Sequence, residues 1–128
     1  MPESTPAPLP EPAPTLGALQ GRVADLLAPV AHPRLGAALA LAEEAGELCR
    51  VVLDHEVYGR PLDRPALAGE LADVLVSAAE LATRYEIDLE RAMADKLADL
   101  ERRVPGWAET LGPALARARA RLDGPPPP

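Results

Sequence analysis

Residues 43–47 read Glu-Glu-Ala-Gly-Glu, and residues 70–73 read Glu-Leu-Ala-Asp. Both segments lie in stretches rich in Ala and Leu, a composition that favours helix over strand. Within each segment two carboxylates stand three positions apart, which places them on one helix face, about 4.5 Å apart along the axis. The stretch 39–75 therefore predicts two helices, each of which presents a pair of carboxylates.

The connection between the two segments predicts that these helices form an antiparallel hairpin. A glycine and a proline mark a turn over residues 58–63, and Asp63 is a good N-cap for the helix that follows. Glu47 precedes this turn by nearly as many residues as Glu70 follows it, so the two carboxylate pairs differ in height by about one helical turn. Side chains from both helices can therefore meet.

The remaining sequence predicts further helices and no strand. Apolar residues recur at helical spacing over 16–27, where Thr15 is a plausible N-cap, over 89–100, and more weakly over 110–122. The helix over 89–100 is expected to stop at Pro105, because proline has no backbone donor. The expected fold is all-α, a bundle of four to five helices.

Length and proline distribution predict one domain with two tails. The chain has 128 residues, of which 16 are proline, and the prolines gather at both ends. Proline-rich ends cannot form a packed core and are expected to be disordered. The predicted organisation is a disordered tail over 1–14, a helical domain over 15–123 and a second disordered tail over 124–128.

Charge and cysteine content narrow the classes of partner and the compartment. The net charge of −7 argues against nucleic-acid binding, because phosphate contacts need clustered Lys and Arg. No apolar run has membrane-spanning length. The lone Cys49 excludes an internal disulfide and fits a reducing compartment, so we expect a cytoplasmic protein. Cys49 itself is interpreted as a packed small apolar side chain.

The acidic segments have two interpretations, a metal site or a solvated helix face. Glutamate is a good helix former, and most helical glutamates face solvent. Against this, Glu43 and Glu47 are like charges at a destabilising spacing, and neither 35–49 nor 65–83 contains a Lys or Arg to offset them. Each segment also borders apolar residues. A bound divalent ion would remove the cost of partly burying these carboxylates, so we favour the metal site.

The ligand type selects the metal. No Cys or His is suitably placed, and an all-carboxylate set favours Mg²⁺, with Mn²⁺ possible, over zinc. Magnesium usually completes its coordination shell with water and substrate phosphates, so the expected substrate is a phosphorylated compound. The predicted metal ligands are Glu44, Glu47, Glu70 and Asp73.

These motifs resemble those of a known family. The pattern Glu-Glu-x-x-Glu over 43–47, followed after twenty-two residues by Glu-x-x-Asp over 70–73, resembles the signature of the MazG-like all-α nucleoside triphosphate pyrophosphohydrolases. Residues 96–105, Lys-Leu-Ala-Asp-Leu-Glu-Arg-Arg-Val-Pro, are similar to the K-x-x-x-N-x-x-R-Y-P stretch of the dCTP pyrophosphatase branch. The resemblance extends over about residues 35–105.

The resemblance implies an enzyme that hydrolyses a nucleoside or deoxynucleoside triphosphate to the monophosphate and pyrophosphate, requires Mg²⁺ and cleans the nucleotide pool. It also implies a homodimer or homotetramer. The residues at matching positions are Glu44, Glu47, Glu70 and Asp73 as metal ligands, and Lys96 and Arg103 as phosphate-binding residues. A spare carboxylate, Glu43 or Glu44, would take the proton of the attacking water.

Two departures from the motif support a second hypothesis. Leu100 stands where the motif has Asn, and Val104 stands where it has Tyr. Aromatic residues able to stack a base are also few, so the sequence does not indicate the base or the sugar. The alternative is a non-catalytic helical interaction or regulatory module that retains the acidic hairpin.

Overall fold

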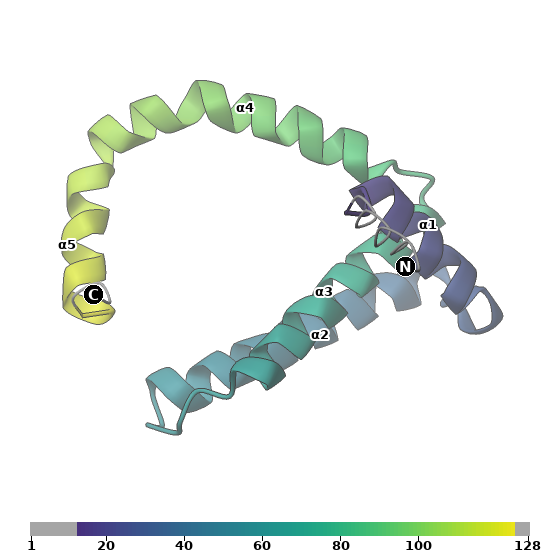
Figure 1. Cartoon of the computed structure of the whole chain (residues 1–128), viewed down its shortest axis with the longest axis horizontal. Coiled ribbons are helices and arrows are strands. Elements are labelled where there is room, and N and C mark those ends of the chain that lie inside the picture. Colours follow the sequence, from purple (N-terminus) through teal and green to yellow (C-terminus); the bar gives the residue numbers. More distant parts are fainter. Residues whose placement is uncertain (1–12, 125–128) are drawn as a thin grey trace, which may run out of the picture. The chain divides into compact units, whose positions relative to one another are not determined.

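The computed structural model describes residues 13–124, and this part of the chain contains helices and no strand. The all-α class predicted from the sequence is confirmed, as is the presence of five α-helices in this range. The predicted tails, 1–14 and 124–128, lie almost entirely outside the described residues. The elements shown in Figure 1 are α1 (Leu16–Leu27), the 3₁₀ helix η1 (Ala28–Val30), α2 (Arg34–Glu56), α3 (Arg64–Arg84), α4 (Leu89–Thr110) and α5 (Gly112–Leu122).

Two helix starts follow the predicted capping residues. The backbone N–H of Ala18 donates to Thr15 Oγ1 at 3.1 Å, and that of Ala66 donates to Asp63 Oδ1 at 2.9 Å. Each bond satisfies an N–H that has no partner within its own helix. Because Asp63 fixes the start of α3, it also sets which residues of α3 face α2.

The predicted stop of the fourth helix at Pro105 is wrong, because α4 continues through this proline to Thr110. The apolar spacing continues as well: Val104, Trp107 and Leu111 extend the stripe of the first part of α4. The Arg103 guanidinium lies over the Trp107 ring, 4.5 Å from its centroid, and so links the turns on either side of Pro105. This contact spans Pro105 and offsets part of the cost of an interior proline, about 3 kcal/mol.

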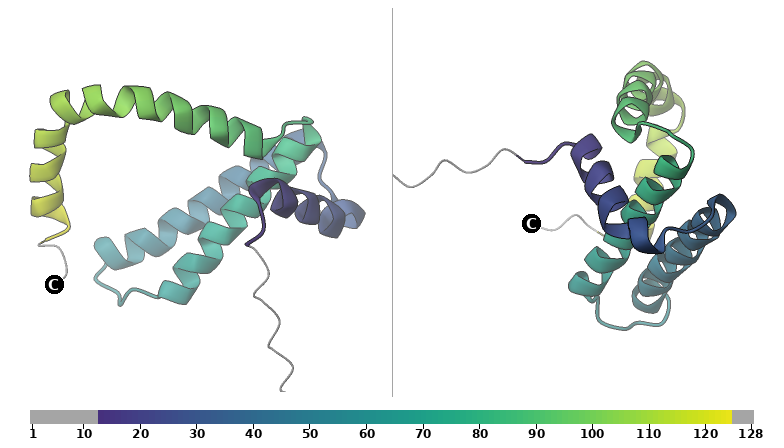
Figure 2. Two further views of the ribbon diagram at one scale, coloured as in Figure 1. Left: turned by 45° about the horizontal axis from the view of Figure 1, so that its top comes forward. Right: turned by 90° about the vertical axis from the view of Figure 1, so that its right-hand side faces the viewer.

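The described chain divides into two compact units, one up to Glu90 and one from Arg91. In the first unit, α2 and α3 lie side by side as the predicted antiparallel hairpin, and α1 packs on α3 (Figure 1 and Figure 2). The buried residues of this unit are small, apart from Glu80: Ala37, Ser77, Ala79 and Ala82. Small side chains between helices let the helix backbones approach each other closely.

Gln20 on α1 ties that helix to the segment after α3. Its side-chain nitrogen donates to the backbone oxygen of Ile87 at 2.8 Å, and its side-chain oxygen accepts from the N–H of Leu89 at 3.0 Å. The amide therefore uses both of its ends. It satisfies the first N–H of α4 and fixes α1 in place.

Glu80 is a buried acid that holds the entry to α2 against α3. The backbone N–H of His32 donates to Glu80 Oε1 at 2.8 Å, and His32 Nδ1 lies 3.1 Å from the same oxygen. Burial raises the pKa of Glu80, but the two hydrogen bonds from His32 and the charges of His32 and Arg84 outweigh it and leave the pKa below its ordinary value. Glu80 is thus a structural carboxylate that is stable in its charged form.

Large apolar side chains are mostly exposed in the described chain. None of them is fully buried. Leu71 and Leu75 on α3 are 48% and 67% exposed. Other apolar residues of α3 are better covered: Ala82 is buried, and Leu67, Val74 and Leu81 are half-buried. None of the described helices has an apolar stretch long enough to span a bilayer.

Candidate metal centre

Three glutamates from the two helices of the hairpin converge on one point. Glu44 and Glu47 come from α2 and Glu70 comes from α3, and one oxygen of each lies within 4.8 Å of the others. We call these residues the glutamate triad. The triad forms because spacings of three positions keep each helix's acids on one face, while the turn over 58–63 brings Glu70 level with them.

The geometry of the triad fits a small divalent cation. Magnesium binds oxygens at about 2.1 Å, so two oxygens that share one ion are at most about 4.2 Å apart, and adjacent ones are about 3 Å apart. The triad's oxygens lie within 4.8 Å of one another, so a shared ion would draw them closer together by rotation of the glutamate side chains. Three carboxylates without nitrogen or sulfur ligands also match the preference of Mg²⁺ and Mn²⁺.

A second observation points to a cation at the same place. Glu70 Oε2 is buried and has no hydrogen-bond partner in the described structure. A buried carboxylate oxygen without a partner is costly, and native proteins usually satisfy such an atom with water or an ion. The surroundings of Glu70 thus provide a position for a positive charge that the protein itself does not fill.

The electrostatics of Glu44 give a third indication. Partial burial and the negative charges of Glu47, Asp73, Glu70 and Glu43 raise the pKa of Glu44 above its ordinary value. The four acids lie close enough to repel the Glu44 carboxylate, which without a cation is easier to protonate. A divalent ion would reverse this effect, since it favours the charged form.

The predicted residues outside the triad lie near it. Asp73 is not among the three converging oxygens, but its charge acts on Glu44, so it borders the triad. Glu43 is exposed and also acts on Glu44. The two roles predicted for these residues, metal ligand for Asp73 and proton acceptor for Glu43, remain predictions.

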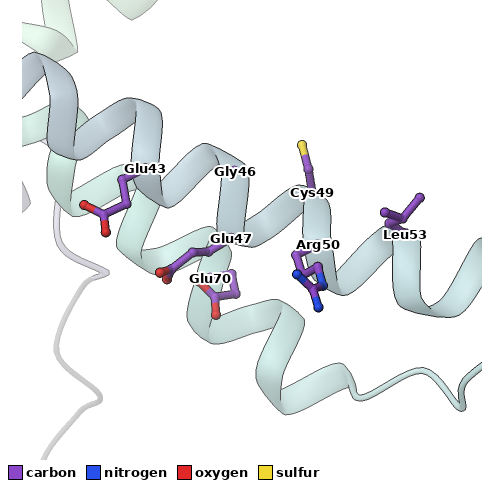
Figure 3. Close-up of a pocket in the computed structure, with 7 residues that line it drawn as sticks. All are labelled: Glu43, Gly46, Glu47, Cys49, Arg50, Leu53 and Glu70. Atoms are coloured by element: carbon purple, nitrogen blue, oxygen red, sulfur yellow. The ribbon is translucent and has the colours of Figure 1, made fainter.

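An open groove of about 620 Å³ runs beside the triad. Figure 3 shows the acids on the side of α2 that faces α3, while the Cys49 thiol points away from them. Cys49 is exposed, so the expectation of a packed cysteine is wrong; its helix face is not covered by another element of this unit. We call this space the α2–α3 groove; it is lined by Glu43, Gly46, Glu47, Cys49, Arg50, Leu53 and Glu70.

The two predicted phosphate-binding residues lie on α4, in the second unit of the chain. Lys96 is exposed. Arg103 donates from Nη1 to Asp99 Oδ2 at 3.3 Å and stacks on Trp107, so its guanidinium already has partners within its own helix. A phosphate contact by Arg103 would have to share or replace these partners.

The sequence interpretation overlooked Arg50, the one basic residue that lines the groove. The signal was available, because Arg50 follows Glu47 by three positions and therefore shares its helix face.

Comparison with known proteins identifies the family of the chain. Residues 34–107, more than half of the chain, match the family model of the MazG nucleotide pyrophosphohydrolase domain. The chain therefore belongs to the MazG nucleotide pyrophosphohydrolase domain family. The matched range includes all of α2 and α3 and most of α4. The chain has no significant match among curated proteins or among solved structures.

Proposed function

We propose that this protein is a magnesium-dependent nucleoside triphosphate pyrophosphohydrolase, in which Mn²⁺ can replace Mg²⁺. The reaction would convert a nucleoside or deoxynucleoside triphosphate and water to the monophosphate and pyrophosphate, and would remove unwanted nucleotides from the pool. The observation that carries the proposal is the glutamate triad with the unpartnered Glu70 Oε2, in a chain that belongs to this family.

The chain's acids would divide into ligands and a base. Glu44, Glu47, Glu70 and Asp73 are proposed to hold the cation, which when bound neutralises phosphate charge and activates water. Glu43 lines the groove but lies outside the three converging oxygens. It therefore keeps a free carboxylate beside the groove, and we favour it over Glu44 as the group that takes the proton of the attacking water.

The polyphosphate also needs positive charge from the protein. Lys96 and Arg103 on α4 are proposed to donate to phosphate oxygens, as the resemblance of residues 96–105 implies. Arginine can bind phosphate through two parallel N–H donors, whereas lysine acts as a point charge. Leu100 cannot supply the side-chain hydrogen bond of the motif's Asn, so sugar selection would use other groups.

A substrate panel tests the proposed activity. The protein is incubated with each ribo- and deoxyribonucleoside triphosphate and Mg²⁺ or Mn²⁺, and released pyrophosphate is detected as phosphate after addition of inorganic pyrophosphatase. We expect turnover of at least one nucleotide, and none by the Glu47→Gln variant with unchanged circular dichroism. If the folded protein hydrolyses no nucleotide, the non-catalytic interaction module becomes the better hypothesis.

The exposed apolar surface supports a homodimer or homotetramer. In the described chain, the buried hydrophobic residues are alanines, while large apolar side chains are exposed on every helix. A surface of this kind on a chain of this size is expected to be covered by another protein surface. A second copy of the chain offers the same surface, and α4 contributes an apolar stripe at alternating spacings of three and four: Met93, Leu97, Leu100, Val104 and Trp107.

A further inference from the structure

The α2–α3 groove is lined by one basic side chain, that of Arg50, to which neither the family motif nor the fold gives a role. Arg50 lines the groove together with Glu43, Glu47 and Glu70. It is one helical turn beyond Glu47 on α2, and Figure 3 shows its guanidinium on the side of α2 that carries the Glu47 carboxylate. The groove therefore combines the glutamate triad with a permanent positive charge, that of the Arg50 guanidinium.

Arg50 is not held by its neighbours. Its side chain is 72% exposed, and its ion pair in the described structure, to Asp54, is long at 3.7 Å. Asp54 has a closer partner, since Arg60 Nη1 donates to Asp54 Oδ2 at 3.0 Å. Exposed pairs of this kind contribute little to stability. The Arg50 guanidinium can therefore turn toward a ligand without leaving Asp54 unpaired.

The charge balance of the groove gives Arg50 a function. A nucleotide polyphosphate that enters the groove is repelled by Glu43 and by the carboxylates of the glutamate triad. A divalent ion offsets only part of this repulsion. An arginine one turn away supplies a planar set of donors that matches two phosphate oxygens at once.

We propose that Arg50 binds the polyphosphate of the substrate on the α2 side of the groove, next to the phosphate held by the metal. This role rests on the proposed function. It makes Arg50 a substrate-positioning residue, in addition to the two basic residues on α4. It also predicts that the phosphate chain lies along α2, from the triad toward Leu53.

Binding of inorganic tripolyphosphate separates this role from that of the metal site. Isothermal titration is done on the full chain, first with Mn²⁺ alone and then with tripolyphosphate in the presence of saturating Mn²⁺. For Arg50→Ala we expect tripolyphosphate affinity to fall on the order of tenfold to a hundredfold. Mn²⁺ affinity should be unchanged or higher, because a neighbouring positive charge has been removed. Arg50→Lys should recover part of the loss.

Two control variants exclude general effects. Arg22→Ala removes an exposed charge of α1 and should bind tripolyphosphate as the wild type does. Asp54→Asn disrupts the ion pairs of both Arg50 and Arg60 but keeps both arginines, and it too should bind normally. If Asp54→Asn reproduces the defect of Arg50→Ala, Arg50 acts through the fold and the proposal is wrong.

The remaining outcomes distinguish this inference from the proposed function. Wild-type protein that binds Mn²⁺ and hydrolyses a nucleotide, with an Arg50→Ala variant that binds tripolyphosphate equally well, overturns the role of Arg50 alone. Equal losses of Mn²⁺ and tripolyphosphate affinity in Arg50→Ala also overturn it, since Arg50 would then organise the metal site. Wild-type protein that binds neither probe overturns the proposed function and this inference together.

Discussion

Glu70 is the residue on which the metal centre depends most. It is the one member of the glutamate triad on α3, and its Oε2 is buried without a partner. Its charge also raises the pKa of Glu44. In the metal-free protein, Glu70 therefore costs stability, and the cost is offset only when a cation binds. Function and stability are opposed at this position.

Replacing Glu70 with Gln is expected to stabilise the metal-free protein and to abolish its response to metal. The gain in EDTA should be about 0.5–1 kcal/mol, because a like charge is removed and an amide can donate to the neighbouring carboxylates. Wild-type protein should gain about 2.7 kcal/mol at Mn²⁺ concentrations near 100 times Kd, and the variant almost nothing.

Thermal melts with and without Mn²⁺ measure both effects. The control is Asp25→Asn, which removes an exposed charge of α1 and should keep the full Mn²⁺ response. A Glu70→Gln protein that is still stabilised by Mn²⁺ would show that the ion binds elsewhere.

Glu80 is expected to stabilise the protein in a pH-dependent way. Because its pKa is lowered in the folded state, the stability it contributes is complete above the ordinary value of 4.5 and is lost as the pH falls through the folded-state value. Glu80→Gln should therefore cost about 1–3 kcal/mol near neutral pH, and the difference from wild type should shrink below pH 4.5.

Urea unfolding of both proteins at a series of pH values checks this prediction. Glu109→Gln, at an exposed position of α4, provides the charge control and should follow the wild type throughout. A cost of Glu80→Gln that stays constant with pH would show that shape, not charge, makes Glu80 important.

At the scale of the element, the α2–α3 hairpin decides whether the two acidic segments meet. Its turn contains Gly59 with φ of +68°, a left-handed conformation that side chains with a Cβ rarely adopt. His55 Nδ1 donates to the backbone oxygen of Arg60, 2.8 Å away, because a carbonyl oxygen can only accept. The turn is therefore well defined, and it sets the register of Glu47 against Glu70.

Alanine substitutions at two glycines should have opposite effects on stability. A Cβ on Gly59 would meet no atom within 4 Å, so Gly59→Ala carries only the backbone cost of a positive φ, about 1 kcal/mol. Gly21 lies inside α1, also with nothing within 4 Å, and Gly21→Ala should stabilise by about 0.5–1 kcal/mol. Chemical denaturation gives both values. Equal signs would contradict the conformation described for the turn.

At the scale of the whole molecule, the exposed apolar residues predict self-association. Leu97 lies in the middle of the α4 stripe and is 52% exposed. If α4 is part of the interface between copies, burying the exposed half of Leu97 there contributes about 0.8–1.5 kcal/mol in each copy. Leu97→Gln should then weaken association by at least about tenfold, while Ala98→Gln, next in sequence but off the stripe, should not.

Light scattering coupled to size exclusion, over a range of protein concentrations, measures the change. We expect the wild type to elute with a mass of two or four chains and to melt at a higher temperature as its concentration rises. A wild-type protein that remains a single chain at high concentration would refute the oligomer. An unchanged mass for Leu97→Gln would place the interface on other helices.

Much of the fold and part of the site could be predicted from local sequence. Helical spacing, the caps at Thr15 and Asp63, and the like-charged segments 43–47 and 70–73 are short-range signals, because each depends on residues within one or two helical turns. Pro105 is an exception: proline disfavours a helix interior, yet α4 continues through it, and the Arg103–Trp107 contact spans it.

The sequence by itself determined the all-α class, the hairpin and the acids available for a cation, since helix periodicity and turn chemistry are properties of neighbouring residues. Only the tertiary structure decided which of the acids converge, that Glu70 Oε2 lacks a partner, and that Arg50 shares their groove. It also showed that Glu80 serves the fold. These outcomes depend mainly on distances between residues far apart in the chain, which are set by the packing of α1, α2 and the segment that joins them against α3.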